Sequence, residues 1–202
     1  MTIKRIAVSA LLTGATAVFS IYSYGNTPES AESPLPGTRL AGQGLLRYFG
    51  FEVYRARLWV PPGFEADDYA AHPLALELAY LRDFSAEPIA RRSLQEMQRQ
   101  EFIAPAQAER WQQALQAALP DVKKGDRLTG VYRPGAGVVF WMQGRVVGEV
   151  ADAQFARLFF GIWLSPRTSE PALRQALTAP RTGPTPRARA AHGQRPTAWP
   201  TG

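Results

Sequence analysis

The chain has 202 residues, with 23 lysine and arginine side chains against 17 aspartate and glutamate side chains, which gives a net charge of +6 at pH 7. It contains no cysteine, which excludes disulfides and lipid-modified cysteines. The whole positive excess lies within the first five residues and after residue 180, so the balanced middle of the chain is not expected to offer a basic face to nucleic acid.

The N-terminal residues 1–24 predict a secretory signal peptide. Lys4 and Arg5 precede a long apolar run that ends near small residues suited to cleavage. We therefore expect an exported, periplasmic protein that is cleaved near 17–24, with a linker over 25–35. The alternative is an uncleaved membrane anchor, which the serines and threonines of the apolar run disfavour.

The first folded element is predicted to be a β-hairpin. Residues 40–48 and 51–60 are rich in β-branched and aromatic side chains, and Phe49 and Gly50 between them suit a two-residue turn. The cross-strand pairs would then be Tyr48 with Phe51, Arg47 with Glu52, and Leu45 with Tyr54.

This register makes Arg47 and Tyr54 diagonal neighbours on one face of the hairpin. A three-residue turn would place them on opposite faces. From spacing alone, the favoured interpretation of Arg47 is a cross-strand ion pair with Glu52 on a half-exposed sheet, which contributes little stability.

The rest of the folded chain mixes strand and helix periodicities. The expected elements, in order, are a strand over 74–81, a helix capped by Ser85, a helix from Pro105 to Pro120, strands over 128–132, 138–142 and 145–150, a helix capped by Asp152, and a helix capped by Thr168 or Ser169 that runs through Leu177. Hairpins with separately grouped helices predict an α+β fold, in which helices cover one side of an antiparallel sheet.

The C-terminal residues 179–202 are rich in proline, glycine, threonine and arginine and have no apolar periodicity, so they predict a disordered tail. Contact with a membrane is expected only through this basic tail or through an uncleaved leader.

Few residues suit metal or cofactor chemistry. The two histidines are His72, in a predicted loop, and His192, in the predicted tail. The carboxylates are scattered singly, and Gly42 and Gly44 do not extend to a phosphate-binding glycine motif. We expect no metal and no cofactor.

Three segments resemble the chalcone isomerase-like family. VYRARLWVPP resembles the family's opening hairpin, the segment from Lys124 to Leu164 resembles its central glycine-punctuated hairpin and helix, and PRTSEPALRQAL resembles its closing segment. The resemblance covers one domain over 36–178. It implies an open-faced β-sandwich, in which one large antiparallel sheet is layered with helices and a ligand lies between them.

The resemblance also implies candidate site residues. Arg47 matches the first-strand arginine that binds the substrate oxyanion in chalcone isomerases, whereas Tyr54 stands where the enzymes have threonine. Phe84 and either Arg91 or Arg92 fall near the tyrosine and asparagine of the enzymes. These departures remove polar groups that order the substrate, so the resemblance argues against cyclisation of chalcones.

Fatty-acid-binding members of the family use an arginine and a tyrosine on these two strands to hold a carboxylate. The resemblance therefore implies an exported, non-catalytic domain that binds a small amphipathic anion such as a fatty acid through Arg47 and Tyr54, with Phe84 and Arg91 nearby. The alternatives are an intramolecular lyase or isomerase of the chalcone isomerase type, in which Arg47 stabilises an enolate, and an interaction module without a ligand.

Overall fold

The structure, a computed structural model, describes residues 34–179. The predicted signal peptide, most of the predicted linker and the predicted tail after residue 179 lie outside these residues. The elements are β1 (Arg39–Tyr48), β2 (Phe51–Val60), the short 3-10 helix η1 (Ala66–Ala71), β3 (Leu74–Tyr80), α1 (Ala86–Gln98), α2 (Pro105–Ala118), β4 (Arg127–Arg133), β5 (Gly137–Met142), β6 (Arg145–Val150), α3 (Ala153–Leu164) and α4 (Pro171–Thr178).

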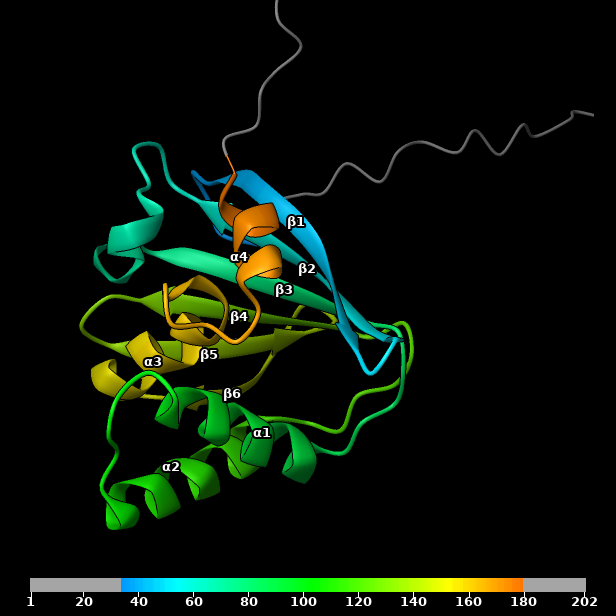
Figure 1. Cartoon of the computed structure of the whole chain (residues 1–202), viewed down its shortest axis with the longest axis vertical. Helices are drawn as coiled ribbons and strands as arrows, with labels where there is room; N and C mark the ends of the chain where they lie inside the picture. The colour runs from blue at the N-terminus through cyan, green and yellow to red at the C-terminus, as the bar shows by residue number, and fades with distance from the viewer. Residues whose placement is uncertain (1–33, 180–202) are drawn as a thin grey trace, which may run out of the picture. The chain divides into compact units, whose positions relative to one another are not determined.

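The six strands form one antiparallel sheet in the order β1-β2-β3-β4-β5-β6, so each strand pairs with the next along the chain. Helices α3 and α4 lie against this sheet, α2 packs on β6, and α1 contacts both α2 and α3 (Figure 1). The predicted α+β fold with one large antiparallel sheet is therefore confirmed.

One row of paired residues crosses all six strands on the face that meets the helices. Its members, from β1 to β6, are Gly42, Leu58, Leu76, Gly130, Phe140 and Gly148. Three of the six are glycines. Because glycine has no side chain, the row combines large apolar residues with positions at which a helix can approach the sheet closely.

Each of these glycines lies under a different helix. A methyl group on Gly42 would overlap the main-chain carbonyl of Ala176 in α4, and one on Gly148 would overlap the carbonyl of Ala118 in α2. A methyl group on Gly130 would lie 3.2 Å from the ring of Phe160 in α3. The glycines therefore set how closely three of the helices pack on the sheet.

Helix α3 supplies most of the apolar layer above the sheet, because Phe155, Phe159 and Phe160 are all buried along it. Its predicted cap is confirmed, since one carboxylate oxygen of Asp152 accepts a hydrogen bond of 2.9 Å from the main-chain N–H of Phe155. The other oxygen accepts one of 2.9 Å from the indole N–H of Trp111 in α2. Asp152 thus joins two helices.

Two other predicted helix starts differ in the structure. Ser85 makes no side-chain cap on α1, and Asp121 instead accepts a 2.8 Å bond from the N–H of Ala86. Helix α4 begins at Pro171, after the predicted caps Thr168 and Ser169, because the Thr168 hydroxyl accepts from the N–H of Glu170 and holds a turn there. Among the helices that the structure describes, none is both long and apolar enough to span a membrane.

Candidate functional site

A small cavity lies between the sheet and helix α3, where the family resemblance places a ligand. Its volume is about 20 Å³, which is room for about one water molecule. The lining residues are Leu76, Leu78, Leu128, Gly130 and Phe140 from the sheet and Phe159, Phe160 and Trp163 from α3. The walls are thus apolar, apart from one indole N–H.

That indole N–H leads to a polar pair with Tyr54, a half-buried residue of β2. The Nε1 atom of Trp163 donates a 2.9 Å hydrogen bond to the hydroxyl oxygen of Tyr54. Burial raises the pKa of Tyr54 well above its ordinary value, and this effect outweighs the bond from Trp163, which lowers it. The phenol therefore keeps its proton at neutral pH. Among residues 34–179, no acceptor for that proton is found.

Two carboxylates make small further contributions to the raised pKa of Tyr54. The carboxylates of Glu96 and Glu170 both act to raise the pKa of Tyr54, as expected for negative charges near an ionising phenol. Glu96 is buried on α1 and pairs with Arg92 at 2.6 Å and with Arg99 at 3.5 Å.

Aromatic contacts extend the site toward α1. The rings of Tyr54 and Tyr80 lie 5.9 Å apart, and those of Tyr80 and Phe84 lie 6.0 Å apart. Phe84 is held by a main-chain bridge to Val122. The structure therefore brings together two of the predicted site residues, Tyr54 and Phe84. Tyr80 connects them, although the sequence pattern predicts it only as part of a strand.

Arg47 does not join this site, which corrects its predicted place beside Tyr54. Its guanidinium pairs with Glu52 at 2.8 Å, and 62% of its side chain is exposed. The two-residue turn and the Arg47–Glu52 pair occur as predicted, but Tyr54 pairs with Leu46 rather than with Leu45. A bulge at Val53 causes this shift, so Arg47 and Tyr54 lie on opposite faces.

Arg91 is also on the surface, where it pairs with Glu87 at 3.0 Å. It lines an open groove of about 650 Å³ between α1 and α2, whose walls include several glutamine side chains together with Leu94 and Ile103. Among the described residues, no three histidine, aspartate or glutamate side chains are grouped as metal ligands. His72 packs its ring 5.6 Å from Phe64, and His192 lies outside the described residues.

Trp163 is a functional candidate that the sequence patterns do not single out. One general signal pointed to it: a buried tryptophan needs an acceptor for its N–H, and the acceptor here is a tyrosine 109 residues earlier in the chain. The sequence alone does not show that Tyr54 is this acceptor, because the two residues are brought together only by the fold.

Comparison with known proteins supports this view of the fold. The sequence model described as chalcone isomerase-like matches residues 27–178 of the chain. Among solved structures, the chain is similar to a fatty-acid binding protein of Arabidopsis thaliana, with a TM-score of 0.58 and 12% identity, over 72% of this chain and 89% of that chain. At this identity the likeness shows the fold. None of the curated protein sequences matches the chain significantly.

Proposed function

The chain belongs to the chalcone isomerase-like family. From this we propose that it is an exported, non-catalytic protein. It binds a small amphipathic molecule, such as a fatty acid, between its sheet and helix α3. The observation that carries the proposal is the apolar cavity beside the Tyr54–Trp163 pair. An apolar pocket with a few inward polar groups is the usual form of a small-molecule site.

The polar head of the ligand would meet Tyr54 rather than Arg47. The protonated phenol offers an O–H donor, whereas Arg47 is exposed on the opposite face. Because burial disfavours a charge at the Tyr54 hydroxyl, a fatty acid is best accommodated there as the neutral acid. This replaces the carboxylate clamp of the sequence-based hypothesis with a neutral hydrogen-bonded head group.

The acyl chain needs more room than the present cavity supplies. Since about 20 Å³ holds only about one water molecule, entry requires the side chains of Phe159 and Trp163 to move away from the sheet. Both side chains belong to α3, and Phe159 contacts Trp163 at a ring distance of 5.4 Å. Ligand binding is therefore coupled to a rearrangement of this helix.

The cavity between the sheet and α3 is almost completely filled by side chains. This observation favours one alternative, an interaction module without a ligand. The isomerase alternative requires Arg47 beside an interior enolate, and the observed pair with Glu52 on the exposed face disfavours it. Export remains part of the proposal and rests on the composition of residues 1–24, which lie outside the described residues.

Mass spectrometry of organic extracts from the purified full chain tests the proposal. The wild type is expected to carry an acyl ligand, either from expression or after incubation with palmitic acid. Gly130→Ala adds a methyl group to the cavity wall, where the ring of Phe160 has to yield by only a few tenths of an ångström, and is expected to carry much less.

The matched control is Gly44→Ala, because Gly44 also faces a helix but does not line the cavity. It is expected to retain the ligand at the wild-type level. A wild-type protein that carries no acyl ligand even after incubation would contradict the proposal and support the interaction module. Equal retention in the two glycine variants would place the ligand elsewhere.

A further inference from the structure

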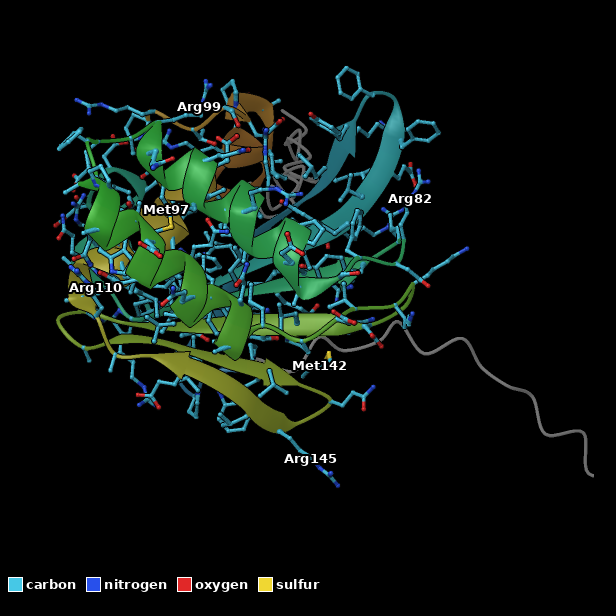
Figure 2. All side chains as sticks on the ribbon, turned by 90° about the horizontal axis from the view of Figure 1, so that it is seen from below. Arg82, Met97, Arg99, Arg110, Met142 and Arg145 are labelled. Atoms are coloured by element: carbon cyan, nitrogen blue, oxygen red, sulfur yellow. The ribbon has the colours of Figure 1, made fainter. Side chains whose placement is uncertain are left out.

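The tip of the β1–β2 hairpin exposes three aromatic side chains within four residues. Tyr48 is 51% exposed, Phe49 83% and Phe51 61%. The hairpin projects beyond the rest of the sheet, with Arg82 beside it (Figure 2). Single exposed apolar residues are common on protein surfaces, but a cluster of this kind marks an interaction site.

The backbone of the turn makes Phe49 an unexpected residue. Both turn residues have positive φ, +48° at Phe49 and +80° at Gly50, which is the two-residue hairpin turn that favours asparagine followed by glycine. The β5–β6 turn has the same form, with φ of +51° and +75°, and there the first residue is the polar Gln143. The fold therefore does not need an aromatic residue at this position, and its presence points to a function.

Positive charge surrounds the aromatic tip. The guanidinium carbon of Arg82 lies 4.7 Å from the centre of the Phe51 ring, and that of Arg92 lies 5.6 Å from the centre of the Tyr48 ring. Within residues 34–179, Arg82 has no carboxylate partner, whereas Arg92 pairs with Glu96 at 2.6 Å. Arg82 thus carries an uncompensated positive charge at this end of the molecule, while Arg99, which contacts Glu96 at 3.5 Å, lies at the far end of α1 (Figure 2).

We propose that the β1–β2 hairpin tip docks on a membrane surface that carries anionic lipid headgroups. Phe49 and Phe51 enter the boundary between headgroups and acyl chains, while Arg82 and Arg92 meet the lipid phosphates. A projecting tip with aromatic side chains and a cationic rim fits a fluid surface, since it needs no preformed pocket in the partner. This surface is additional to the two chain ends, where the sequence placed membrane contact, and it is independent of any ligand under α3.

Co-sedimentation with lipid vesicles tests this docking surface. The full-length chain is mixed with vesicles of equal parts phosphatidylcholine and phosphatidylglycerol, or with phosphatidylcholine alone. Phe49→Gln, which copies the residue at the β5–β6 turn, is expected to weaken partitioning to the mixed vesicles roughly tenfold. Arg82→Gln is expected to weaken it about fivefold on the mixed vesicles and to have no effect on neutral ones.

The matched control is Phe102→Gln, because Phe102 is a single exposed phenylalanine in the α1–α2 loop, at 86% exposure. It is expected to bind as the wild type does. All variants share the same chain ends, so binding that Phe49→Gln leaves unchanged would overturn the proposal and assign the attraction to those ends. A wild-type protein that does not bind the mixed vesicles would overturn it as well. Equal melting temperatures establish that the variants are folded.

Discussion

The variant Gly148→Ala is expected to lose about 3 kcal/mol or more of unfolding free energy. The added methyl group would overlap the main-chain carbonyl of Ala118 at the end of α2. A main-chain atom cannot rotate away, so β6 or α2 has to shift as a whole. Chemical denaturation measures the loss, and the midpoint should fall without a change in slope.

Gly44→Ala is the matched control for this effect. Its methyl group would meet the side-chain ends of Leu173 and Ala176 in α4, and the leucine end can rotate away. We expect a loss of about 1 kcal/mol there. Equal losses in the two variants would contradict the view that the glycines of the sheet are needed where main-chain atoms of the helices come close.

The second large effect is expected from Trp163→Ala, at about 3–5 kcal/mol of unfolding free energy. Trp163 is buried, contacts the Phe159 ring and donates to the Tyr54 hydroxyl. Its removal leaves a large void in the layer between α3 and the sheet and takes the donor away from an interior phenol oxygen. Urea unfolding measures the loss.

Trp141→Ala controls for the loss of a tryptophan as such, because Trp141 lies on β5 and is 36% exposed. Its cost should be much smaller. A double-mutant cycle of Trp163→Phe with Tyr54→Phe then isolates the hydrogen bond, for which we expect a coupling of about 1 kcal/mol. Additive effects in this cycle would show that the bond adds nothing to stability.

Much of the fold follows from local sequence patterns. The two-residue turn at Phe49 and Gly50, the Arg47–Glu52 pair and the Asp152 cap involve residues at most five apart and were predicted correctly. The order of strands and helices was also predicted, because alternation and helical spacing repeat over whole elements. The 3-10 helix η1 was missed, since it has no such repeat.

Features that depend on distant parts of the chain were not predictable in the same way. The cap on α1 comes from Asp121, 35 residues after Ala86. The bulge at Val53 has no local signal, yet it moves Arg47 and Tyr54 to opposite faces. One irregular residue thus decides whether the predicted carboxylate clamp can form, and it leaves Tyr54 paired with Trp163 instead of lying beside Arg47.

The ligand is proposed to bind with its head group at Tyr54 and not at Arg47. Titration of the full chain with palmitic acid, compared between Tyr54→Phe and Arg47→Ala, distinguishes these two positions. Tyr54→Phe removes the interior O–H donor and should weaken binding about tenfold. Arg47→Ala changes an exposed ion pair and should alter affinity by no more than about twofold. Loss of binding in Arg47→Ala with wild-type affinity in Tyr54→Phe would contradict the account.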